Sequence, residues 1–123
     1  MRVFTTYDFD RLIKKEKNIS DDDLIKAVGL INEKHSIGGN LYKLRVASNS
    51  GQGKSGGSRV ILSAKINENY YYILAFKKNA KGNIDQREEK MLKLLSKVLQ
   101  GWSDSDISKA KEVGEIREVV KNG

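Results

Sequence analysis

Apolar and polar residues alternate in two segments in the middle of the chain, which is the pattern of half-buried β-strands. In residues 41–47 the alternation puts Lys43 and Arg45 on one face and apolar side chains on the other. In residues 58–66 it puts Arg59 opposite a row of aliphatic side chains. Both predicted strands therefore have one face for a core and one face that carries cations.

An apolar run with three consecutive tyrosines predicts a third strand over residues 70–76. The short polar segment 67–69 is typical of a tight turn, so the second and third strands are expected to form an antiparallel hairpin. By alternation, Tyr71 lies on the face opposite to Tyr70 and Tyr72, and it alone of the three can share a face with the cations. The equal alternative is that all three tyrosines pack in the core.

Three positions have the signature of a helix start, a capping residue followed three residues later by an acid. They are Ser20 with Asp23, Asp85 with Glu88, and Ser103 with Asp106. The first begins an amphipathic helix predicted over residues 21–34, and apolar spacing in residues 9–13 predicts a shorter helix before it. The two are expected to form an N-terminal helical hairpin. The acids that begin the helix are interpreted as favouring the helix dipole, not as metal ligands.

The second capping signature begins a helix predicted over residues 86–100. Its apolar positions recur at helical spacing and are expected to face the core; they are Met91, Leu94, Leu95, Val98 and Trp102. A short helix follows, and then either a final strand or an extended tail over residues 116–120; a short strand is also possible at residues 3–4. With no internal repeat and no proline, the whole chain, 1–123, is predicted to be one α+β domain.

The excess of positive charge lies in one central segment of the chain, residues 40–81. The chain has 23 Lys and Arg against 16 Asp and Glu, a net charge of +7. Residues 40–81 hold one acid, Glu68, and eight bases, and the rest of the chain is balanced. The eight are Lys43, Arg45, Lys54, Arg59, Lys65, Lys77, Lys78 and Lys81. A local excess of this kind is typical of a protein with a polyanionic partner.

Composition excludes several classes of site and location. There is no Cys, which excludes disulfides, thiolate nucleophiles and zinc–thiolate centres. His35 is the only histidine, so a multi-histidine metal site is excluded, and its position near a helix end favours a structural or surface role. No metal or other cofactor is expected. No apolar stretch is long enough for a membrane span and no signal peptide is evident, so we expect a cytoplasmic protein.

The segment Gly53-Lys54-Ser55 ends like a phosphate-binding P-loop but fails the full pattern. Ser48 stands where the first glycine is required, and a strand follows where the motif needs a helix. Two interpretations stay open: a plain Gly/Ser-rich connection between two strands, or a loop whose backbone approaches a phosphodiester chain, with Lys54 adding a charge. No small-molecule substrate is expected.

Four stretches occur in a distinctive order: residues 38–47 (GGNLYKLRVA), 51–59 (GQGKSGGSR), 76–79 (FKKN), and 83–84 (NI) ahead of Glu88. In this order the chain resembles the RelE/HigB-type toxins of bacterial toxin–antitoxin pairs. The resemblance implies a compact domain with a twisted antiparallel sheet. It also implies a toxin that enters the ribosomal A site, cleaves the messenger RNA there, and is neutralised by an antitoxin protein.

Metal-free RNA cleavage needs a proton acceptor for the 2′-hydroxyl, a proton donor for the leaving oxygen, and cations that stabilise the phosphorane. Since histidine pairs are excluded, the sheet cations are the candidates, and crowding of like charges makes a lysine a better base. The resemblance supports this choice, since ribosome-dependent nucleases of the family tend to use Lys, Arg and Tyr. Carried onto this chain, it implies as catalytic residues, with Arg59 first, Arg59, Lys43, Arg45 and Lys54. The proposed RNA-binding residues are Lys77, Lys78, Lys65 and Tyr71.

An alternative function stays open. The C-terminal segment after Gly114 has no tyrosine, whereas some nucleases of this family use one there. A basic face without matched catalytic geometry would bind RNA or the ribosome without cutting, and related folds inhibit DNA gyrase. The alternative is therefore a non-catalytic toxin of the same fold.

Overall fold

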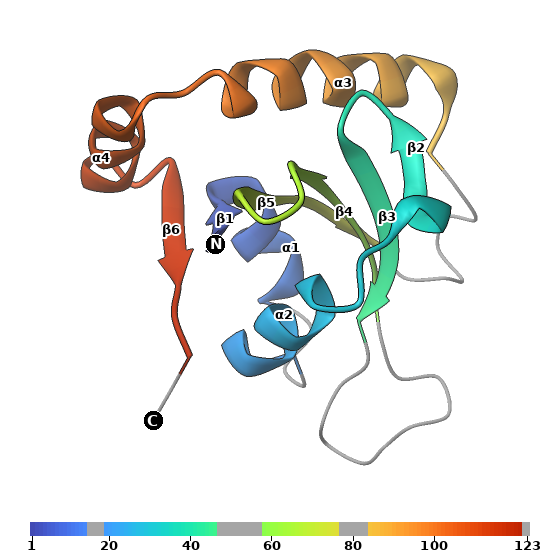
Figure 1. Ribbon diagram of the computed structural model, residues 1–123, viewed down its shortest axis with the longest axis horizontal. Coiled ribbons are helices and arrows are strands. Elements are labelled where there is room, and N and C mark those ends of the chain that lie inside the picture. The colour runs from blue at the N-terminus through green and yellow to red at the C-terminus, as the bar shows by residue number, and fades with distance from the viewer. Residues whose placement is uncertain (15–18, 47–57, 77–83, 122–123) are drawn as a thin grey trace.

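The computed structural model describes residues 1–14, 19–46, 58–76 and 84–121 and shows an α+β fold (Figure 1). In chain order the elements are β1 (Arg2–Thr6), α1 (Tyr7–Ile13), α2 (Asp21–Val28), the 3-10 helix η1 (Glu33–His35), β2 (Ser36–Gly38), β3 (Leu41–Val46), β4 (Ser58–Ala64), β5 (Asn69–Phe76), α3 (Gln86–Gln100), α4 (Asp104–Glu112) and β6 (Ile116–Val119). Among the described residues, no helix combines the length and the apolar character that crossing a membrane requires.

The six strands form one sheet in the order β2-β3-β4-β5-β1-β6. Neighbouring strands are antiparallel except β1 and β5, which are parallel and pair Val3 with Tyr70. The predicted antiparallel sheet is thus right for β3, β4 and β5. The short strand predicted at residues 3–4 is β1, which is longer than predicted and lies inside the sheet between β5 and β6. The sequence analysis did not predict β2.

Helices α1 and α2 cover one face of the sheet. Phe9 of α1 and Leu24 of α2 are fully buried there, and the Phe9 ring lies 5.0 Å from the Tyr72 ring. The Tyr72 hydroxyl donates a 2.6 Å hydrogen bond to the Leu24 carbonyl, and burial raises the pKa of that hydroxyl. Each helix packs mainly on the strands, so the predicted helical hairpin is not confirmed.

Helix α2 ends at Val28, six residues before the predicted end. Gly29 closes the helix, and the chain then forms the 3-10 turn, in which the Asn32 side chain accepts a hydrogen bond from the Lys34 amide. The His35 Nδ1 atom accepts a hydrogen bond from the Asn32 amide at 3.2 Å. His35 therefore caps a turn, which agrees with its predicted structural role.

Helices α3 and α4 cover part of the opposite face. All three predicted capping boxes, including those that begin these helices, are formed. Tyr71 is fully buried on this face, stacked on Phe4 at a ring distance of 5.0 Å and met edge-on by Trp102 at 6.2 Å. A buried 2.6 Å hydrogen bond between the Ser63 and Ser96 hydroxyls fixes α3 against β4.

The prediction of which face of α3 packs on the core is wrong. Of the five residues predicted to face the core, only Trp102, just beyond the end of α3, packs there. Met91, Leu94, Leu95 and Val98 are exposed, and the helix contacts the sheet through a different set. That set includes Leu92, Ser96 and Leu99. Helical periodicity identifies an apolar stripe but says nothing of what covers it, and here a buried serine pair turns another side of α3 towards the sheet.

Candidate nucleic-acid interface

On the face shared with α3, three rows of side chains cross strands β3, β4 and β5. From the α3 end outwards they are Leu41–Ser63–Tyr71, Lys43–Ile61–Leu74 and Arg45–Arg59–Phe76. We call the last of these the arginine row. The alternation predicted for β3 and β4 is confirmed, since Lys43, Arg45 and Arg59 share this face while Tyr42, Leu44 and Val60 pack in the core with α1 and α2.

A β-bulge brings Phe76 into the arginine row. The register between β4 and β5 shifts between Ile61 and Leu62, which leaves Ile73 as an extra residue in β5. Strict alternation from Tyr71 would put Phe76 on the opposite face, because one inserted residue reverses the direction of every side chain after it. Sequence analysis therefore missed Phe76 as part of the site.

Helix α3 covers the first row and leaves the arginine row open. Gln100 donates a 2.9 Å hydrogen bond to the Ser63 hydroxyl, and Lys93 packs on Gly39 in the β2–β3 turn. Gly39 has a φ of +63°, and a Cβ there would lie 2.8 Å from Lys93 Cγ, so this approach requires glycine. In Figure 1, the turn between β2 and β3 lies next to α3, and β3 runs away from the helix. Arg45, at that far end, is exposed.

The electrostatics of the arginine row favour an anion. Arg45 and Arg59 are direct cross-strand partners, with Cα atoms about 5 Å apart as in any antiparallel pair. Like charges in such a pair destabilise a sheet, and strands β3, β4 and β5 contain no Asp or Glu. Two guanidinium groups beside a half-buried aromatic ring, Phe76, form a surface suited to a phosphate and a base.

A comparison with protein families matches this chain over residues 1–119. The matching family is described as the RelE toxin of the RelE / RelB toxin-antitoxin system. The chain belongs to the RelE toxin family. Among curated proteins no match was found. The arginine row and its neighbours are thus the candidate interface of a RelE-family toxin.

Other predicted site residues of this RelE-family chain are placed differently. Lys43 lies in the row next to the arginine row and is half-buried. Lys65 is exposed just beyond β4, six residues and about 20 Å along the chain from Arg59. Tyr71 is fully buried, which leaves no surface for RNA, so we assign it to the core. Lys54, Lys77 and Lys78 lie outside the described residues.

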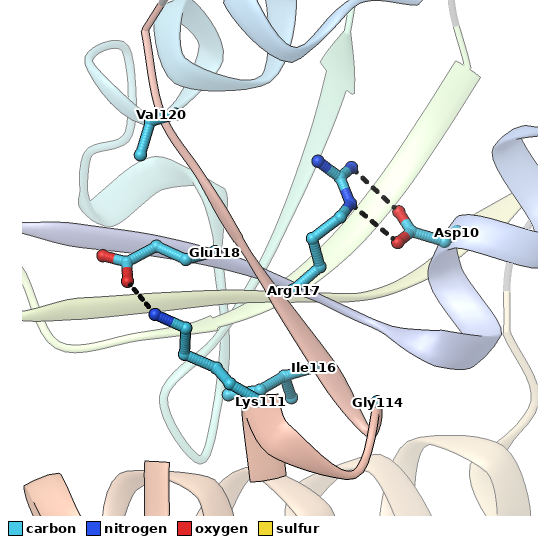
Figure 2. Close-up of a pocket in the computed structure, with 7 residues that line it drawn as sticks. All are labelled: Asp10, Lys111, Gly114, Ile116, Arg117, Glu118 and Val120. Atoms are coloured by element: carbon cyan, nitrogen blue, oxygen red, sulfur yellow. Dashed lines mark hydrogen bonds and ion pairs between the residues drawn. The ribbon is translucent and has the colours of Figure 1, made fainter. Parts of the chain in front are cut away.

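A shallow pocket lies around β6, the strand at one edge of the sheet (Figure 2). Its charges are already paired: the Arg117 guanidinium donates hydrogen bonds to Asp10 and Asp21, and these bonds raise the pKa of Arg117. Glu118 accepts hydrogen bonds from Arg2 and Lys111. This neutralised cluster attaches β6 to its neighbours and is not a candidate for RNA binding.

The Glu118 ion pairs predict a pH-dependent stability. Hydrogen bonds from Arg2 and Lys111 lower the pKa of Glu118 from its ordinary 4.5 to about 2, so the stabilisation is present above pH 4.5 and is lost as the pH falls towards 2. Glu118→Gln is expected to lower the unfolding free energy by about 1–2 kcal/mol at pH 7. Thermal unfolding between pH 7 and 2 should show this difference shrinking below pH 4.5. Glu112→Gln, at an exposed position of α4, is the control, and a pH-independent difference would contradict the assignment.

Proposed function

We propose that this RelE-family chain is a ribosome-dependent endoribonuclease that cleaves translated messenger RNA at the arginine row. The observation that carries the proposal is the direct Arg45–Arg59 pair beside Phe76 on a sheet face that α3 leaves uncovered. The resemblance to RelE/HigB-type toxins supports the same activity. Binding to the ribosomal A site would place the protein in the cytoplasm.

The proposed reaction is an attack by a ribose 2′-oxygen on the adjacent phosphorus. A base takes the 2′-hydroxyl proton, the P–O2′ bond forms, and the P–O5′ bond breaks as an acid protonates the leaving oxygen. The products are a 2′,3′-cyclic phosphate and a 5′-hydroxyl end. No metal or other cofactor takes part in this scheme, because the cations of the site compensate the extra negative charge on the phosphorane.

Each member of the site has a proposed role. Arg59, between Arg45 and Phe76 in its row, stabilises the phosphorane, and Arg45 holds a phosphate in a bidentate contact. Lys43, one row closer to α3, is the candidate base among the described residues. Phe76 supplies a ring on which a base can stack.

Further cations extend the proposed RNA path. In the sequence, Lys54 lies between β3 and β4, and Lys77 and Lys78 follow β5. They are proposed as further phosphate contacts, with Lys54 also a candidate for catalysis. Lys65, beyond the opposite end of β4, is proposed only as a contact to more distant RNA.

We propose that the second partner is an antitoxin protein encoded with this chain, as membership of the toxin–antitoxin family implies. The antitoxin would neutralise the toxin by direct binding. A pull-down with the product of the neighbouring gene tests this pairing separately from any assay of RNA cleavage.

The test of the proposed activity is a purified translation system with a defined messenger RNA. The protein is expected to cut the message in the A-site codon only while ribosomes are translating, and to leave free RNA intact. Intact messenger RNA after incubation with translating ribosomes would contradict the proposal. A parallel assay of DNA supercoiling tests the non-catalytic alternative. Inhibition of gyrase without cleavage of messenger RNA would establish a toxin that acts on gyrase.

A further inference from the structure

Helix α3 has an apolar stripe that no element of the described chain covers. Met91, Leu94, Leu95 and Val98 follow the spacing i, i+3, i+4 and i+7, and their exposed fractions are 65%, 60%, 38% and 56%. We call these four residues the α3 stripe. Figure 1 shows α3 along the outside of the molecule, with the sheet on one side only.

The α3 stripe is unlike the scattered apolar residues of an ordinary surface. Four large aliphatic side chains lie within two turns on one side of a 15-residue helix. The inner side of the same helix already supplies its packing, through the Ser63–Ser96 hydrogen bond and the buried Leu99. Stability of the fold therefore does not explain the stripe, and contiguous exposed apolar patches of this kind mark interaction sites.

Cations border the α3 stripe on one side. At 100° per residue, Lys90 and Lys97 line one edge, and Arg87 lies one turn before the N-terminal end of the stripe. All three are exposed, and none forms an ion pair with another residue in the described part of the chain. The surface thus combines an apolar strip of helical spacing with an unneutralised positive border.

We propose that the α3 stripe is the docking site of the antitoxin, which contributes an amphipathic helix with apolar residues at helical spacing and acids along one flank. Apolar ridges of this spacing fit a partner helix, and the border of Arg87, Lys90 and Lys97 fits its acids. A second copy of this chain would bring a net charge of +7 and the same cationic border, and it is the less complementary occupant. The inference rests on the proposed antitoxin partner and not on RNA cleavage.

Calorimetry with the purified antitoxin encoded beside this chain tests the docking site. Leu94→Glu combined with Val98→Glu is expected to weaken binding about 100-fold or more, because it puts two acids into an apolar contact facing acidic residues. Val113→Glu with Val120→Glu changes two exposed valines outside α3 and is expected to stay within about threefold of wild type. Lys90→Glu with Lys97→Glu is expected to weaken binding about tenfold and to flatten its salt dependence. Circular dichroism checks that each variant is folded.

Three results would overturn the proposal. One is wild-type affinity of the Leu94→Glu, Val98→Glu variant, and another is the absence of any binding by the wild-type chain. The third is a wild-type dimer in sedimentation that this variant dissociates, since a second copy would then be the occupant. Because the readout is binding, inactivity in the ribosome assay would refute the proposed cleavage without affecting this result.

Discussion

Replacing Arg59 with Ala is expected to slow messenger RNA cleavage on the ribosome by about 100- to 1000-fold while leaving the protein folded. Arg59 is the central member of the arginine row, so its guanidinium is the group best placed to meet charge that develops on the phosphorane. Loss of one positioned donor of this kind costs a factor of this size in other enzymes. Its removal also relieves the like-charge pair with Arg45, so stability should not fall.

The experiment follows cleavage of a defined message by primer extension, with thermal unfolding of each variant as the check on folding. Arg59→Lys is expected to be intermediate, because it keeps the charge and loses the bidentate geometry. Arg11→Ala removes an exposed cation from α1, on the other side of the sheet, and should cleave like wild type. Cleavage by Arg59→Ala within about threefold of wild type would remove Arg59 from the catalytic site.

Replacing Tyr71 with Ala is expected to lower the unfolding free energy by about 3–5 kcal/mol, enough to unfold a marginally stable domain. The ring is fully buried between Phe4 and Trp102, so truncation leaves a cavity in the core that α3 and α4 cover. Urea denaturation of the purified variant measures the change. By contrast, Tyr71→Phe keeps the ring and should stay within about 1 kcal/mol of wild type.

Tyr71→Phe also separates a core role from the RNA contact that the sequence predicted. If Tyr71 acts only in packing, this variant cleaves messenger RNA at the wild-type rate. A loss of cleavage of tenfold or more at unchanged stability would show that the hydroxyl takes part in the reaction and that the core assignment is wrong.

The sequence predicts the local parts of this fold well, because local chemistry determines them. A capping pair such as Ser20 and Asp23 satisfies backbone amides within one turn, and all three predicted pairs are formed. Alternation in β3 correctly puts Lys43 and Arg45 on one face, since the pleat of a strand has a fixed period of two. The cationic part of the candidate site could therefore be predicted.

Features that depend on distant residues could not be predicted. The bulge at Ile73 turns Phe76 towards Arg59, but the residues around Ile73 include no glycine or turn residue that would predict it. The side of α3 that packs on the sheet depends on Ser63, thirty-three residues away from Ser96. The parallel pairing of β1 with β5 likewise joins segments far apart in the chain, and short-range patterns contain no information on it.

The central claim is that the arginine row directs a ribose 2′-oxygen to its own phosphate, and one substitution in the RNA tests it most directly. Ribosomes translating a defined message are stalled with one chosen codon in the A site. That codon carries either normal riboses or a single 2′-deoxyribose at the scissile position. We expect the wild-type protein to cut the normal message, leaving a 2′,3′-cyclic phosphate and a 5′-hydroxyl, and to leave the deoxy message intact. Equal cutting of both messages, or cutting of neither, would contradict the proposed mechanism.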